Sequence, residues 1–323
     1  MNSTTSGWFV RQLLLAAAAG LIACAAGWAQ NRRDCSLAVV SRVVGDDTRV
    51  CDTKVVQEIA GGGRAFEQNQ MGIASVLALG PDFNEKEALS WFQKAAQQGY
   101  APAQVNLAVM YANGWGIAVN YGTALHWLRA AADQHFGRAY YNLGILYLEG
   151  NGVRRDNVEA FHWFQKGAKA GDSSAQTNLG YMYDQGLGCE RNSAAALAWY
   201  RKAAEAGNAL GQNNLADMYL RGEGVRQDDA VAFRWFQKAA AQGQTGARIK
   251  LGFMYANGQG TTKDLEKGYS WIAAADMAGD PRGRELMHSL EKSLGAEQLS
   301  RAREAAKKLL PVERELSARN FVQ

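Results

Sequence analysis

The sequence predicts an all-α protein, a right-handed superhelical solenoid of antiparallel helix pairs with a 36-residue repeat. Two observations lead to this prediction. Tryptophan recurs every 36 residues, at Trp91, Trp127, Trp163, Trp199, Trp235 and Trp271. A leucine, a tyrosine and a pair of glycines recur with the same interval. One helix pair of this size cannot bury its apolar stripe alone, so neighbouring units are expected to stack.

The first helix of each unit carries one apolar stripe. Ala103, Leu107 and Tyr111 stand at i, i+4 and i+8, which is the spacing of one helix face. A glycine pair should end each first helix, because residues without Cβ readily adopt the positive φ that a helix end and a tight loop require. The pairs are Gly114/Gly116, Gly150/Gly152, Gly186/Gly188, Gly222/Gly224 and Gly258/Gly260.

The second helix of each unit is expected to start at a capping side chain. Asn and Asp accept hydrogen bonds from the free N–H groups of a helix start. They recur at Asn84, Asn120, Asp156, Asn192, Asp228 and Asp264. Within the helix the tryptophan has small neighbours, such as Ala124 and Ala131 around Trp127, which would let another helix approach closely. The helix should end at a glycine in every unit but one, where His135 replaces it.

These residues carry a family resemblance. The pattern Ala-x-x-x-Leu-Gly-x-x-Tyr-x-x-Gly-x-Gly-Val-x-x-Asp over residues 139–156 is similar to the Sel-one-like repeat (SLR), a relative of the tetratricopeptide repeat. We expect six such repeats over residues 65–290. The first is degenerate, because Glu67, Met71 and Ser75 replace the expected Ala, Leu and Tyr. A divergent terminal copy is typical of an end-capping repeat.

Residues 1–29 have the pattern of a secretory signal peptide, in which Arg11 precedes an apolar stretch. Two ways of processing stay open. Cleavage after Ala29 would release a periplasmic protein, whereas a lipobox ending at Cys24 would place a lipid-anchored protein at the outer membrane. Both predict export.

Two further segments flank the repeats. Residues 30–64 end in a glycine-rich linker and contain Cys35 and Cys51, which we expect to form a disulfide in an oxidising compartment. Residues 291–323 are predicted to form a C-terminal capping helix and tail. One face of that helix would be lined by Leu294, Leu299, Ala302, Ala306 and Leu309.

No catalytic motif of a common enzyme class accompanies the repeats, so we predict a non-enzymatic protein with no cofactor and no metal. His126 and His162 share one repeat position, but no Cys, Asp or Glu ligand recurs beside them. A net charge of +4 with scattered basic residues argues against nucleic acid as a partner.

The alternative is an envelope enzyme or cell-wall-binding protein that acts on peptidoglycan or β-lactams. Such activities have been linked to some cysteine-rich members of the family that the chain resembles. The repeats here contain one cysteine, Cys189, which occupies an otherwise apolar position. Residues 289–292 spell Ser-x-x-Lys but lack the Ser-Asp-Asn and Lys-Thr-Gly elements that accompany it in penicillin-binding enzymes.

The resemblance implies that the first helices line a concave face that binds a peptide or protein segment. Positions two residues before and after the repeat leucine vary between copies, whereas the core positions barely change. The candidate contacts on these positions are Val109, Tyr141, Ile145, Tyr181, Asn213, Asp217 and Phe253. The competing interpretation is that they pack against the next repeat. Trp115, between two glycines, is a further candidate contact unless it folds back over a neighbouring loop.

Overall fold

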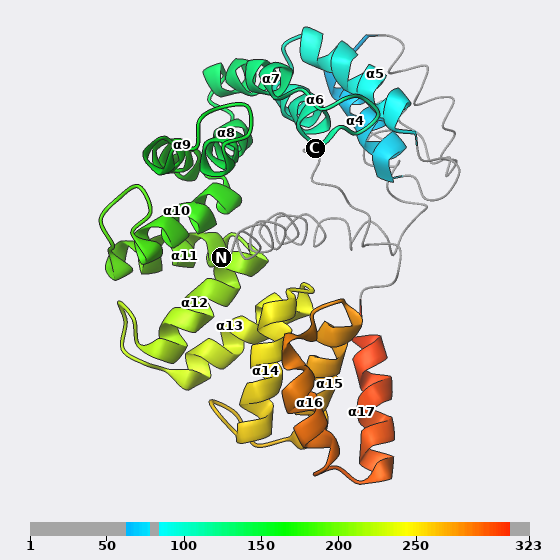
Figure 1. Cartoon of the computed structure of the whole chain (residues 1–323), viewed down its shortest axis with the longest axis vertical. Helices are drawn as coiled ribbons and strands as arrows, with labels where there is room; N and C mark the ends of the chain where they lie inside the picture. Colours follow the sequence, from blue (N-terminus) through cyan, green and yellow to red (C-terminus); the bar gives the residue numbers. More distant parts are fainter. Residues whose placement is uncertain (1–62, 78–83, 311–323) are drawn as a thin grey trace, which may run out of the picture. The chain divides into compact units, whose positions relative to one another are not determined.

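The computed structural model describes residues 63–77 and 84–310, which contain fourteen α-helices, one short 3-10 helix and no strand (Figure 1). The predicted signal peptide, Cys24, Cys35 and Cys51 lie outside these residues. The helices are α4 (Ala65–Leu77), α5 (Glu85–Gln97), α6 (Ala101–Asn113), α7 (Tyr121–Asp133), α8 (Gly137–Glu149), α9 (Asn157–Lys169), α10 (Ser173–Gln185), α11 (Ser193–Glu205), α12 (Ala209–Arg221), α13 (Asp229–Ala241), α14 (Thr245–Asn257), α15 (Leu265–Met277), η2 (Pro281–Gly283), α16 (Arg284–Glu291) and α17 (Ala296–Lys308).

The described helices divide into two compact units, and the division falls in the sequence of α10, between Ala175 and Gln176. Inside each unit a helix packs mainly against the next one along the chain, as α8 does against α9 and α14 against α15. The predicted solenoid of helix pairs with a 36-residue repeat is therefore confirmed. None of the described helices is both long and apolar enough to span a bilayer.

The six predicted N-caps of the second helices are confirmed. Asn120, for example, has extended backbone, and its Oδ1 accepts a hydrogen bond from the N–H of Thr123 at 2.9 Å. The equivalent bond is present at the start of α5, α9, α11, α13 and α15. Each cap satisfies an N–H group that the helix leaves without an internal partner.

The helix ends also follow the sequence pattern. The glycine pairs have positive φ, and Gly114 closes α6 in the left-handed region with φ of 71°. His135 replaces the glycine at the end of α7 and adopts φ of 59°, the one positive φ outside glycine among the described residues. The imidazole Nδ1 lies 3.1 Å from the hydroxyl of Tyr140, and this contact holds the ring against α8.

The most deeply buried large side chain of each second helix is the residue after the tryptophan. Tryptophans are half-buried, and Trp163 stacks on Tyr140 with ring centroids 6.0 Å apart. The buried residues that follow them are Phe92, Leu128, Phe164, Tyr200, Phe236 and Ile272. A Cβ on Gly144 would lie 2.6 Å from the ring of Phe164, so that glycine makes room for the ring. The tryptophans thus mark the repeat but do not form the centre of its core.

Three helices close the C-terminal end. Helices α16 and α17 pack against α15, and the five residues expected to line the closing face share one apolar cluster. Ala302 and Ala306 are buried at its centre, and the other three, Leu294, Leu299 and Leu309, lie around them. The small alanines let α17 approach α15 closely.

Candidate functional site

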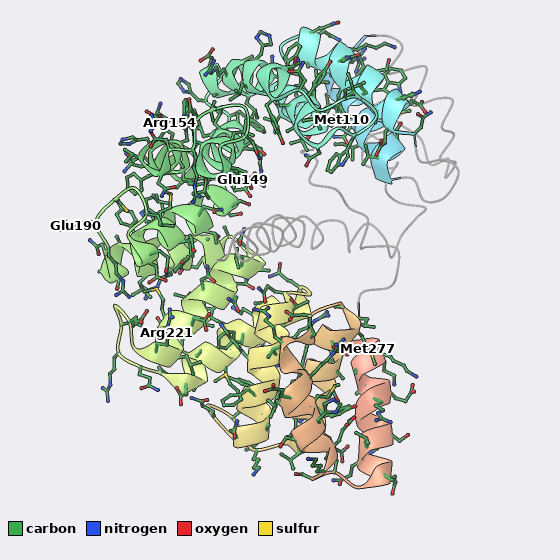
Figure 2. The ribbon with its side chains drawn as sticks, viewed as in Figure 1. Met110, Glu149, Arg154, Glu190, Arg221 and Met277 are labelled. Atoms are coloured by element: carbon green, nitrogen blue, oxygen red, sulfur yellow. The ribbon has the colours of Figure 1, made fainter. Side chains whose placement is uncertain are left out.

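A cavity of about 390 Å³ lies in the unit that begins at Gln176, among α10, α11, α12, α14 and η2. Its lining side chains come from helices that neighbour each other in the repeat. They are Thr177, Tyr181, Asp184, Tyr200, Leu210, Asn213, Asn214, Asp217, Arg221, Gln244, Gly246, Ile249, Lys250 and Arg282. Arg221, the last residue of α12, is labelled in Figure 2.

Three candidate contacts predicted from the repeat variation line this cavity: Tyr181, Asn213 and Asp217. The cavity also includes Thr177 and Ile249, which hold the variable position two residues before the repeat leucine. The structure therefore brings together residues from consecutive first helices, because equivalent positions of stacked repeats lie side by side.

The predicted contact residues of the other unit mostly pack inside the protein. Tyr141 is 4% exposed, and its ring centroid lies 6.0 Å from that of Phe164. Burial raises the pKa of the Tyr141 hydroxyl to about 12, since the phenolate would lose its hydration. Ile145 is also buried, and Val109 packs against an apolar cluster.

Two further predicted contacts lie elsewhere. Phe253 is 48% exposed on α14 and does not line the cavity. Trp115 is half-buried against the cluster that contains Phe92.

The basic side chains at the cavity each have an acidic partner. Lys250 Nζ pairs with Asp217 Oδ2 across two neighbouring first helices. Arg221 lies 3.1 Å from Glu223. Arg282 Nε donates to Asp280 Oδ1 at 2.8 Å, a local pair at the start of η2.

The pKa values of these groups reflect their pairing. Burial of Asp280 tends to raise the pKa of its carboxyl, but the hydrogen bonds from Arg282 and Thr245 and the charge of Arg282 together outweigh burial and lower the pKa. Asp280 therefore stays ionised and keeps the charge of Arg282 compensated.

Two adjacent side-chain amides, those of Asn213 and Asn214, line the cavity and are hydrogen-bonded to each other. Asn213 Nδ2 donates to Asn214 Oδ1 at 3.0 Å and lies 3.4 Å from Asp217 Oδ2. Next to them Tyr200 is 2% exposed. Its burial and the nearby charge of Asp184 raise the pKa of its hydroxyl well above the ordinary value, so Tyr200 stays neutral. The cavity is thus a polar recess with aromatic walls, suited to holding a side chain.

Most of the lining residues escaped the sequence analysis, among them Asp184, Asn214, Lys250, Gln244 and Arg282. One of them carried a signal. The residue after the recurring tyrosine is Ala112, Leu148, Leu220 or Ala256 in the other full repeats, and only the copy at 184 has a charged residue there. A break of this kind in an apolar repeat position points to a local function.

The residues considered for metal binding, thiol reactivity or penicillin-binding chemistry do not line this cavity. His126 and His162 are exposed, and no group of three potential metal ligands occurs in the described ranges. The thiol pKa of Cys189 is raised by burial, which favours the neutral thiol. Ser289 and Lys292 are exposed near the end of α16 and line neither this cavity nor a second one among α15, α16 and α17.

The fold defines a class of repeat protein, the solenoid of stacked helix pairs. The Sel1 repeat family model matches six segments of the chain, residues 75–100, 101–136, 137–172, 173–208, 209–244 and 246–280. The chain belongs to the Sel1 repeat family. Proteins of this architecture generally serve as scaffolds for protein–protein interaction. The six matches agree with the six predicted copies, and the first match is short, at the copy predicted to be degenerate.

Two solved structures illustrate the relationship. A protective antigen of uropathogenic Escherichia coli that displays an SLR fold is 32% identical, with a TM-score of 0.63 over 80% of this chain and 56% of its own. The present chain thus spans little more than half of that antigen. A Sel1 repeat protein from Oxalobacter formigenes is 32% identical, with a TM-score of 0.62 over 67% of this chain and 89% of its own. The comparison with curated proteins gave no match.

Proposed function

We propose that the protein is a non-enzymatic interaction scaffold of the bacterial cell envelope that binds a peptide or protein segment at the cavity among α10, α12 and α14. The observation that carries the proposal is the placement of Tyr181, Asn213 and Asp217 around one cavity. These residues occupy positions that vary between repeats whose cores are otherwise alike. Variable side chains that gather around a recess, on a constant frame, are typical of a recognition surface.

The envelope location rests on the sequence of residues 1–29, which has the charged start and apolar stretch of a signal peptide. Intact-mass analysis of the exported full-length chain tests it. A mass that begins at Gln30 indicates ordinary cleavage, and a lipid-modified mass that begins at Cys24 indicates a lipoprotein. A chain that keeps residues 1–29 and stays in the cytoplasmic fraction would contradict export.

Site-specific photocrosslinking in living cells tests the binding role. A benzoylphenylalanine at Leu210, which lines the cavity, should crosslink to a defined envelope protein that mass spectrometry identifies. The matched control is the same group at Glu205, which is exposed at the end of the neighbouring helix α11.

A crosslink at position 210 that is absent at position 205, and that disappears in a Tyr181→Ala/Asn213→Ala background, supports the proposal. Equal crosslinking at both positions would assign the contact to the general surface and remove the cavity from the function.

A further inference from the structure

Asp184 is a charged residue in a place where the repeat calls for an apolar one. It follows the recurring tyrosine of α10, at the position of Ala112 and Leu220 in other copies. The residue is 6% exposed, and it lines the cavity among α10, α12 and α14. A carboxylate so deeply buried is costly unless a cation or several donors compensate it.

The hydrogen bonds of Asp184 leave it undercompensated. Its Oδ2 accepts from the amide of the adjacent Gln185 at 3.1 Å. Its Oδ1 is buried and has no hydrogen-bond partner. Among the residues that the structure describes, no Lys, Arg or His lies within ion-pair distance of this carboxylate.

A second buried acceptor lines the same cavity. Asn213 is 7% exposed, and its Oδ1 also has no partner. The carboxylate of Asp217 and the Oδ1 of Asn214 both face the Nδ2 of this amide, which assigns the other terminal atom as the oxygen. A flipped amide would place oxygen against oxygen, so Oδ1 stays an unfilled acceptor.

The nearby cations already have other partners. Arg191 Nε donates to the backbone carbonyl of Asp184 at 2.8 Å, and Arg191 Nη2 lies 4.0 Å from Glu223. Lys250 pairs with Asp217, Arg221 with Glu223 and Arg282 with Asp280. The cavity therefore has two unfilled acceptors and one uncompensated negative charge, with the rings of Tyr181 and Tyr200 in its walls. The ligand group that fits such a recess is a cation with several N–H donors. The tyrosine rings would also attract a cation.

We propose that this cavity binds the ammonium or guanidinium group of a lysine or arginine side chain of the partner, with Asp184 as the counter-charge and Asn213 as a second acceptor. The anchor would enter from an extended segment, and small rotations of the Asp184 and Asn213 side chains would turn their buried, unfilled oxygens to the cation. This inference rests on the proposed scaffold function and specifies what the scaffold recognises.

Selection of peptide ligands tests the proposal with the full mature chain. The probe is a library of random dodecapeptides displayed on phage, followed by calorimetry with the selected synthetic peptides. We expect the selected peptides to share a lysine or arginine at one position. Replacing that residue with norleucine or citrulline, which keep its length without the charge, should weaken binding about tenfold or more.

The matched protein variants are Asp184→Asn and Glu205→Gln. Both remove one negative charge from neighbouring helices, but Glu205 is exposed and outside the cavity. Asp184→Asn should lose binding by a similar factor, and Glu205→Gln should bind as the parent does. Because the peptide substitutions leave the protein untouched, they decide the question even where Asp184→Asn fails to fold.

The outcomes separate the two claims. Selected peptides that bind but need no cationic residue, or that bind Asp184→Asn undiminished, overturn the cationic anchor and leave the scaffold function in place. Failure to select any peptide, together with no crosslink at Leu210, overturns the scaffold function itself.

Discussion

At the scale of single residues, two glycines of the last repeat have the same backbone conformation but different surroundings. Gly260 and Gly279 have φ of 67° and 89°. A Cβ at Gly260 would lie 2.2 Å from the carbonyl oxygen of Asp229, whereas a Cβ at Gly279 would meet nothing within 4 Å. Gly260 is therefore required both for its positive φ and for the close approach of its loop to α13. Gly279 is required for its positive φ alone.

Alanine at the two positions should therefore have unequal effects. Gly279→Ala should lower the free energy of unfolding by about 1–2 kcal/mol, the cost of a left-handed conformation with a Cβ. Gly260→Ala should cost about 1–3 kcal/mol more, because the loop must move away from α13. Urea denaturation followed by circular dichroism measures both. Equal losses would show that the close approach contributes nothing.

Arg248 is the most deeply buried charge of the described chain that has no acidic partner. It is 1% exposed, and its guanidinium donates to the carbonyl oxygens of Ala240, Ala274 and Leu309 at 3.3, 3.4 and 2.8 Å. These carbonyls lie at the C-terminal ends of α13, α15 and α17. Three negative helix ends thus take the place of a counter-ion.

Replacing Arg248 with glutamine should release α17 but leave α13 in place. The side-chain amide of Gln212, the equivalent residue one repeat earlier, donates one hydrogen bond, to the Ala204 carbonyl of the preceding helix, and its Oε1 accepts from Gln242. Glutamine at position 248 should keep that one bond and lose the contact to Leu309. Amide hydrogen exchange should rise in α17 and stay unchanged in α13, with exposed Arg234→Gln as the control. Unchanged exchange in α17 would remove Arg248 from the anchoring of that helix.

At the scale of the element, ion pairs attach the C-terminal helix to its neighbours. Arg301 of α17 lies 2.7 Å from Glu266 of α15, and Arg303 lies 3.1 Å from Glu291 of α16. The hydrogen bond from Arg301 lowers the pKa of Glu266. Hydrogen bonds from His288, Tyr269 and Arg303 lower that of Glu291.

These shifts predict that acid loosens α17. A carboxyl whose pKa is lower in the folded state stabilises that state at pH values above its ordinary value of 4.5, and the contribution is lost as the pH falls through the folded pKa. Lowering the pH from about 6 to about 3 should therefore speed amide exchange in α17, beyond the intrinsic effect of pH.

The variant Arg301→Gln/Arg303→Gln provides the control for this effect. It should show faster exchange in α17 already at neutral pH and a smaller further change in acid. An identical pH response in the variant and the parent would show that the ion pairs do not hold the helix.

The elements themselves were largely predictable because their ends are encoded locally. An N-cap such as Asp228 and a left-handed glycine such as Gly222 each act within one turn of their own position, so the sequence pattern reveals them directly. Burial was harder to read. The sequence drew attention to Trp163, but Phe164 is the buried ring, because helix rotation decides which of two adjacent aromatic residues faces inward.

The cavity was only partly predictable for a related reason. Tyr181 and Asn213 followed from comparing variable positions of the first helices, which stack with a constant period. Asp184 lies one position after the recurring tyrosine, in the core register, and Arg282 lies beyond the last repeat. Which core position opens onto a recess depends on the volumes of several neighbouring side chains, and one repeat alone does not contain that information.

At the scale of the whole molecule, contacts between helices are mostly between neighbours in the sequence. In such a chain the free energy of unfolding is close to the sum of the intrinsic stabilities of the repeats and the interface energies between adjacent repeats. A substitution in one repeat should therefore destabilise only that repeat and its neighbours. Leu107 and Leu251 are the fully buried repeat leucines of α6 and α14 and belong to separate apolar clusters. The same substitution, leucine to alanine, can therefore be made at an equivalent position in each of the two compact units.

Leu107→Ala should destabilise its surroundings by about 2–5 kcal/mol, through lost apolar burial and the cavity left behind. Amide exchange measured by mass spectrometry should accelerate in α4 to α8 and remain at the parent rate in α14 to α17. Leu251→Ala should give the reverse pattern, which controls for any general effect of a core cavity. Uniform acceleration in both variants would mean that the chain unfolds as a single cooperative unit, and the nearest-neighbour description would then be wrong.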